Sequence, residues 1–157
     1  DPTASHWTRH PGHYATGDLA CRRAGTVEFF GRLDEVVSVS GQLVSLNEVR
    51  DALLDQPFVA AAEVFERTDS RLGRSVAAAV VLNDGAPSDA TTLREMQDSV
   101  RELLGGLSRP RALLVVDRFG SELTGTGLSR ALAALSVSVD TDPVTVTWEQ
   151  VLAAAGR

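Results

Sequence analysis

The sequence predicts an α+β fold, with helices packed against a central three-stranded sheet and a small β-hairpin at the N-terminal end. Short valine-rich segments with alternating or unbroken apolar residues predict the strands. Two Ser/Thr-x-x-Glu sequences before runs with helical spacing predict helix starts. The expected order is three strands, a helix, two strands, a helix, a strand and a helix, an arrangement typical of α+β domains.

The bulk composition fits one compact unit, or one unit with appendages. The chain has 157 residues, of which 43% are hydrophobic and 23% charged. The net charge of −6 disfavours nucleic acid as a partner, because no basic stripe is available to neutralise phosphates. All 15 basic residues are arginine, so no step of the chemistry can use a lysine ammonium group.

Cysteine usage and hydropathy indicate a cytoplasmic protein without a membrane partner. The single cysteine, Cys21, rules out an internal disulfide and fits a reducing compartment. No apolar run reaches the 18 residues that a membrane-spanning helix needs. The chain begins at Asp1 in a loop-like segment, which we interpret as a piece cut from something larger or trimmed.

The N-terminal elements are short. Residues 1–13 lack periodicity and are expected to form a loop. Residues 19–23 and the segment from Thr26 predict an antiparallel pair around a turn at Ala24-Gly25. A further strand is expected over residues 36–40, ended by Gly41.

The first helix has a readable start at Ser45. Ser45 and Glu48 have the spacing of a capping box, and leucine and valine then recur at helical spacing through Asp55. Pro57 ends the helix, because its ring cannot continue the hydrogen-bond ladder. Two strand-like runs follow, from Val59 and from Arg74, separated by a polar turn.

The second helix is expected from a capping box at Thr92 and Glu95 to the glycine pair at residues 105–106. The run "RALLVVDRF" then predicts a strand buried on both faces. A glycine-rich loop follows, and we expect a short helix over residues 129–135, capped by Ser129. "VTVT" and a terminal helix anchored by Trp148 complete the chain.

Three separated stretches together resemble the end of the AMP-forming acyl-CoA synthetases and related adenylating ligases: residues 14–65, "RPRALLVVDRF" and "TGTGLSRAL". The joint spacing of TGD, GRLD and VSG carries the resemblance, and "SGQLVSLNEVR" is most similar to the aryl- and benzoate-type ligases. The resemblance implies a small mobile C-terminal lid domain at residues 32–138. Residues 1–31 would be the tail of a large N-terminal body, and residues 139–157 an extension with the terminal helix.

Asp18 and Arg32 are the candidate nucleotide ligands. A carboxylate after a glycine in a loop can accept from both hydroxyls of a ribose, and the resemblance implies that Asp18 binds the AMP ribose. The alternative is a residue that only shapes an Asx-type turn. The fork of Arg32 suits ribose or phosphate oxygens; the alternative is a surface arginine paired with Asp34 or Glu35.

Two further residues match the family's moving parts. Asp34 matches the hinge around which the lid rotates, a place where a loop residue absorbs a large change of backbone angles. Gly41 matches the loop beside the pantetheine arm of coenzyme A, where a missing Cβ lets a ligand approach. The alternative for Gly41 is a glycine that merely ends a strand. Many relatives carry arginine where this chain has Leu43, although the benzoate-type pattern also lacks it.

The loop "TGTGLSR" resembles the family's Thr-x-Ser/Thr-Gly-Lys loop, with Leu128 in the position of the catalytic lysine. In the family, that lysine bridges the substrate carboxylate and the α-phosphate. Losing one such preorganised charged donor typically costs about 2.7–4 kcal/mol, or about 10²–10³ in rate. Arg130 is a possible substitute but leaves the helix in another direction, and the plain structural alternative is a glycine-rich turn before a helix.

His6, His10 and His13 are spaced as metal ligands could be, but no cysteine or acidic residue accompanies them. We therefore interpret them as loop histidines and expect no metal site in the chain.

The resemblance implies the C-terminal part of an acyl- or aryl-acid ligase that uses ATP and AMP, with Mg²⁺ bound through the nucleotide. Coenzyme A or the phosphopantetheine of an acyl carrier protein would accept the acyl group, and the absent body would bind the carboxylic acid. We expect weak adenylation, a better preserved thioester-forming step, and no activity of the isolated chain. The alternatives are a degenerate, non-catalytic protein-interaction module and, third, an unrelated binding protein with chance matches.

Overall fold

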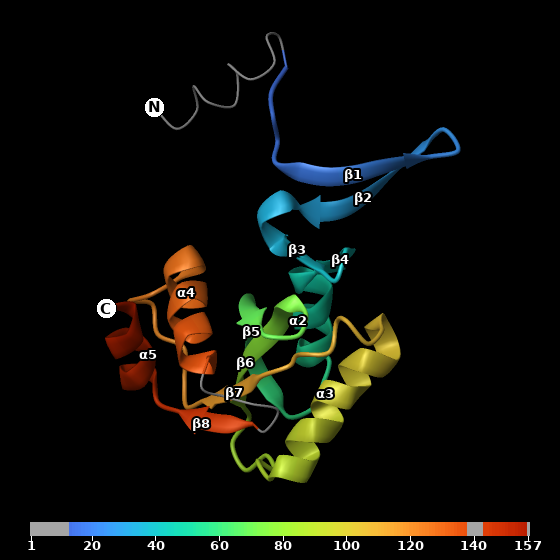
Figure 1. Cartoon of the computed structure of the whole chain (residues 1–157). Coiled ribbons are helices and arrows are strands. Elements are labelled where there is room, and N and C mark those ends of the chain that lie inside the picture. Colours follow the sequence, from blue (N-terminus) through green and yellow to red (C-terminus); the bar gives the residue numbers. More distant parts are fainter. Residues whose placement is uncertain (1–12, 138–142, 157) are drawn as a thin grey trace. The chain divides into compact units, whose positions relative to one another are not determined.

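The computed structural model describes residues 13–137 and 143–156 (Figure 1). The chain divides into two compact units, Asp1–Val36 and Val37–Arg157.

The first unit is a two-stranded antiparallel hairpin. β1 (Asp18–Arg23) pairs with β2 (Thr26–Arg32), with a bulge between Leu19 and Ala20. The turn at residues 24–25 lies where the sequence predicts it, so the expected hairpin is confirmed. A single 3-10 turn, η1 (Leu33–Glu35), follows directly.

A second short pair begins at the boundary between the units. β3 (Val36–Val39) pairs with β4 (Gln42–Ser45), a four-residue strand that the sequence did not predict. The turn between them, Ser40 and Gly41, has φ angles of 50° and 81°. Two consecutive positive φ angles are the signature of the type I′ turn that joins hairpin strands. Gly41 therefore stands at a turn, where a residue without Cβ is favoured.

The central sheet has four strands in the order β5-β6-β7-β8. Their bounds are Val59–Asp69, Gly73–Leu82, Leu113–Val116 and Val144–Val146. β5 and β6 are antiparallel, whereas β7 pairs parallel with β6, and β8 with β7. The α+β fold is confirmed, but the expected three-stranded sheet is wrong by one strand. The short "VTV" run acquires its sheet role only from its partner β7.

Two helices cover one face of this sheet. α2 (Leu46–Leu54) begins as predicted, with the Ser45 hydroxyl accepting from the Glu48 backbone N–H at 3.3 Å. α3 (Ala90–Leu104) ends at Gly105, as predicted. Its predicted start at Thr92 is wrong, because Asp89 is the N-cap.

The carboxylate of Asp89 outcompetes the Thr92 hydroxyl for the helix start. One carboxylate oxygen accepts from the backbone N–H groups of Thr91 and Thr92, each at 3.0 Å, and the other accepts from the Thr92 hydroxyl at 2.7 Å. A carboxylate at a helix start also interacts favourably with the helix dipole. Thr92 is consequently a donor inside the first turn rather than the cap.

The other two helices cover the opposite face of the sheet. α4 (Gly125–Ser136) begins four residues before the predicted start, and Ser129 is not its cap. The Ser129 hydroxyl lies within the helix, where it donates to the Gly125 carbonyl at 3.3 Å. α5 (Trp148–Ala155) forms as predicted and starts with a complete capping box between Thr147 and Gln150.

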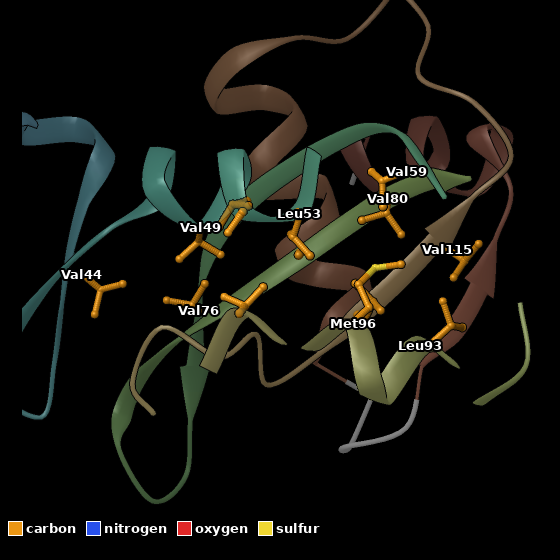
Figure 2. Close-up of a cluster of buried hydrophobic side chains, with 14 of the residues drawn as sticks. Val44, Val49, Leu53, Val59, Val76, Val80, Leu93, Met96 and Val115 are labelled. Atoms are coloured by element: carbon orange, nitrogen blue, oxygen red, sulfur yellow. The ribbon is translucent and has the colours of Figure 1, made fainter. Parts of the chain in front are cut away.

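The sheet is buried on both faces, so the second unit has two hydrophobic clusters. Alternate residues of β6 and β7 point to opposite faces. Figure 2 shows the cluster under α2 and α3, in which Leu53, Met96 and Val115 meet from two helices and a strand. The cluster under α4 and α5 contains Phe65 and Trp148. The sequence predicted this burial for the strand at residues 113–116, all four of which are buried.

Over the described ranges, the helices fall short of the length and apolar character needed to cross a membrane. The longest of them, α3, has 15 residues.

Candidate functional site

The open end of the first hairpin brings three of the predicted site residues together. Asp18 and Arg32 are opposite partners in the ladder between β1 and β2. The Arg32 Nε donates to Asp34 Oδ1 at 2.9 Å. This hydrogen bond and the charge of Asp34, with a smaller contribution from Asp18, raise the pKa of Arg32 above its ordinary value. The result is an exposed cluster of one guanidinium and two carboxylates.

Hydrogen bonds donated by backbone N–H groups stabilise this end of the hairpin. The Leu33 N–H donates to the Gly17 carbonyl at 2.7 Å, and the Asp18 N–H donates to the Thr16 hydroxyl at 3.2 Å. These bonds engage the backbone of Asp18, while its side chain stands on the exposed surface. An exposed carboxylate beside a guanidinium can accept from ligand hydroxyls while the guanidinium donates to ligand oxygens.

Gly41 lies in the other unit, at the tip of the β3–β4 hairpin. A Cβ built on Gly41 would meet no described atom within 4 Å, so the turn borders open space. Leu43 is exposed near it, at the second residue of β4. The turn geometry accounts for the glycine, and the open space leaves its backbone accessible.

Leu128 is part of the hydrophobic core. Only 7% of its surface is exposed, and it belongs to the cluster of Phe65, Trp148 and the inner face of α4. Arg130, two positions further along α4, is exposed. The residue in the proposed lysine position thus packs inward, and the nearby cation of the same helix lies on the solvent side.

A half-buried charge cluster beside α4 was missed by the sequence interpretation. Arg50 of α2 approaches the Glu63 carboxylate of β5 at 3.9 Å, and its other terminal nitrogen donates to Asn47 at 2.7 Å. Burial raises the pKa of Glu63, an effect partly offset by the charge of Arg50 and by the nearby hydroxyl of Ser129. The available signal was a glutamate inside the otherwise apolar run "VAAAEVF".

The chain offers no obvious metal cage in its described parts. Between residues 13 and 137, and again from 143 to 156, no three His, Cys, Asp or Glu side chains are grouped as metal ligands. His13 is exposed, and His6 and His10 lie outside the described residues.

An α+β unit with helices over both faces of its sheet is shared with solved structures of adenylate-forming ligases. A family model described as "AMP-binding enzyme C-terminal domain" matches residues 48–128. The chain belongs to this family.

Among curated proteins, the acetyl-coenzyme A synthetase of Rubrobacter xylanophilus is 31% identical over 137 residues. The alignment covers 87% of this chain but only 21% of that enzyme. The corresponding enzyme of Deinococcus radiodurans is 34% identical, and 22% of it is covered. The chain therefore spans about a fifth of the length of these relatives.

A solved structure of the amide bond synthetase McbA from Marinactinospora thermotolerans gives a TM-score of 0.61 at 30% identity. The match covers 79% of this chain and 25% of McbA. The match to large ligase chains over one portion supports the resemblance seen in the sequence.

Proposed function

We propose that this chain is the C-terminal part of an AMP-forming carboxylic acid–CoA ligase, in which Asp18 and Arg32 contact the AMP ribose. The main observation in support is that Asp18 and Arg32 are paired across β1 and β2 and exposed at the same end of the hairpin. A carboxylate and a guanidinium side by side match the donors and acceptors of a ribose diol.

Asp34 is proposed as the hinge. It lies in the single 3-10 turn between β2 and β3, and the two compact units divide only two residues later. A hinge needs short, exposed backbone between packed bodies, because few contacts then oppose the change in φ and ψ. The Arg32–Asp34 ion pair would stabilise one conformation of this turn.

Gly41 is proposed to border the path of the thiol acceptor. The turn is open on its outer side, so the pantetheine arm of coenzyme A, or of an acyl carrier protein, could run along the backbone. In this reaction the thiol sulfur forms a bond to the acyl carbon of the acyl-adenylate, AMP leaves, and the thiol proton passes to solvent or a base.

Leu128 is proposed to make the preceding adenylation step slow. In that step a carboxylate oxygen bonds to the α-phosphorus of ATP and pyrophosphate leaves, so negative charge accumulates where the family's lysine would lie. A leucine side chain can neither donate a hydrogen bond nor supply a positive charge, and the buried position of Leu128 supports a packing role instead. The exposed Arg130 stays the alternative source of charge.

Mg²⁺ is proposed to arrive bound to the nucleotide, and the carboxylic acid to be held by a large N-terminal body. The division at Val36 and the exposed Val27 and Phe29 of the hairpin support residues 1–31 as the tail of such a body. Residues 32–138 would form the lid, and residues 139–157 its extension. The isolated chain should be inactive, and its single cysteine fits the cytoplasm.

The test joins this chain to the N-terminal body of an acetyl-coenzyme A synthetase and follows the two half-reactions separately. We expect slow ATP–pyrophosphate exchange but measurable thioester formation from supplied acyl-adenylate. Leu128→Lys should raise the exchange rate by about 10²–10³, whereas Leu128→Met should not.

Two further variants assign the other roles. Asp18→Asn should weaken AMP binding, measured by calorimetry, and Gly41→Ala should slow only the thioester step, because its φ of 81° strains alanine. Unchanged AMP affinity in Asp18→Asn, with the fold intact, would contradict the nucleotide assignment.

The second candidate function is a non-catalytic interaction module of the same fold. The burial of Leu128 favours it, since a core leucine is what a domain freed from lysine chemistry would carry. No gain in adenylation by Leu128→Lys in a correctly folded fusion would support this candidate.

A further inference from the structure

The loop that joins β7 to α4 is wrapped around the first residue of α5. The Trp148 backbone N–H donates to Asp117 Oδ1 at 2.7 Å, and the indole Nε1 donates to Glu122 Oε2 at 3.3 Å. The Phe119 ring meets the indole edge to face, with centroids 6.2 Å apart and planes at 81°. Three residues of this loop, Asp117, Phe119 and Glu122, therefore contact the side chain or the backbone of Trp148.

Gly120 completes this contact by lying directly against the indole. A Cβ at residue 120 would lie 2.6 Å from Trp148 Nε1 and 2.9 Å from Cε2, and also against the Glu122 carboxylate. Real Cβ atoms do not approach other atoms so closely, so any side chain at 120 would push the loop off the indole. The glycine is required here by close packing rather than by a positive φ.

The loop residues held against Trp148, 117–122, come just before the glycine-rich segment Thr124–Gly127. A Cβ on Gly127 would come within 3.0 Å of Leu123 Cδ1, so this segment is also packed closely against the end of the loop. Leu128 shares a hydrophobic cluster with Trp148, which is fully buried. The position of the segment is thus fixed from the α5 side.

α5 lies beyond the part of the chain that the family model matches, which ends at residue 128. The contacts described above join residues 117–122 to Trp148, 26 to 31 positions away in the chain. An element outside the matched region thereby contacts a loop inside it.

We propose that Trp148 is a positioning residue for the Thr124–Gly127 segment. The indole holds the preceding loop by a hydrogen bond to Glu122, an aromatic contact to Phe119 and close packing on Gly120. The role in chemistry rests on the proposed ligase function, because a preorganised loop is what acyl-adenylate formation demands. These contacts between Trp148 and the loop, which we call the clamp, are present in the chain whether or not it takes part in that reaction.

Hydrogen exchange of the unliganded chain tests the clamp, comparing the peptide over residues 117–129 with the β5–β6 hairpin. Glu122→Ala should speed exchange in the loop peptide by about three- to tenfold, the effect of one lost hydrogen bond on local opening. Glu122→Gln keeps an acceptor and should restore slow exchange. Arg118→Met removes an exposed ion pair to Glu149 and should have little effect.

A second pair of variants tests the packing. Gly120→Ala should speed exchange in the loop, because its Cβ strikes both the Glu122 carboxylate and the indole. This extra effect should shrink when Trp148→Leu removes the two indole atoms and releases the Glu122 carboxylate from its hydrogen bond, so that the carboxylate can move away. Additive effects in the double variant, or loop exchange unchanged by both Glu122→Ala and Gly120→Ala, would overturn the proposal. The exchange experiments use neither nucleotide nor thiol substrate, so a negative result in them would not contradict the ligase proposal. Likewise, a negative ligase assay would not contradict the clamp.

Discussion

The two compact units distribute burial and charge in opposite ways. In the hairpin unit, Val27 and Phe29 are each 66% exposed, and the same hairpin carries Asp18 and Arg32. In the second unit the four-stranded sheet is covered by helices on both faces, and every buried hydrophobic side chain that the structure describes lies there. An isolated two-stranded hairpin is only marginally stable. The candidate nucleotide residues are thus held by local contacts, and the stability of the chain comes from the sheet.

The strongest test of this contrast substitutes one residue type in both units. Phe65→Ala, in the cluster under α4 and α5, should cost about 3–5 kcal/mol of unfolding free energy, because Phe65 is 1% exposed. Phe29→Ala should change it by less than about 0.5 kcal/mol. Urea unfolding followed by circular dichroism measures both, and equal losses would show that the hairpin contributes to the common core.

A second test concerns the position that matters for both stability and chemistry. Leu128→Lys should cost about 2–3 kcal/mol, because an ammonium group must leave the cluster around Phe65 and Trp148 for water. Leu128→Met keeps the volume and should cost less than about 1.5 kcal/mol. A Leu128→Lys variant as stable as the parent would mean that α4 readily exposes this position.

A smaller effect is expected at the start of α2. Ser45→Ala removes the oxygen that accepts from Glu48 and should cost about 1 kcal/mol. Ser70→Ala, in the exposed turn between β5 and β6, serves as the control and should be neutral in the same urea titration. Equal losses would exclude a capping role for Ser45.

The smallest effect depends on pH. Since burial raises the pKa of Glu63 in the folded state, the unfolded chain releases this proton at lower pH than the folded chain. The unfolding free energy of the parent should therefore fall, relative to Glu63→Gln, as pH rises from the ordinary carboxyl range towards neutrality. Arg50→Met should enlarge the fall, because the charge of Arg50 opposes the shift. Parallel pH profiles for parent and Glu63→Gln would contradict a buried, disfavoured carboxylate.

Local signals in the sequence were reliable where the interaction is itself local. The turn at residues 24–25 and the Ser45 cap depend on neighbours within a few positions, and both are confirmed. The burial of residues 113–116 depends on distant partners, but it is also confirmed, because an unbroken apolar run leaves neither face suited to water. Competition between nearby polar groups explains the wrong helix starts. Asp89 accepts the bonds that were assigned to Thr92, and Ser129 donates to Gly125 instead of capping α4.

The pairings in the candidate site depend on more than local signals. The predicted hairpin brings Asp18 and Arg32 to the same end, but the turn alone would set Asp18 opposite Gly31, and the bulge between Leu19 and Ala20 shifts it opposite Arg32. The approach of Arg50 to Glu63 could not be predicted either, because it requires α2 to pack on β5.

By itself, the sequence determined the family, the α+β order of elements, the hairpin with its charged end and the absence of any lysine. Only the tertiary structure decided that β8 extends the sheet, that Leu128 faces the core, and that Trp148 contacts the loop at residues 117–122. Periodicity and capping act over one or two turns of chain and are written in adjacent residues. Burial and contacts between distant segments depend on which faces pack together, and that is fixed only when the whole sheet is assembled.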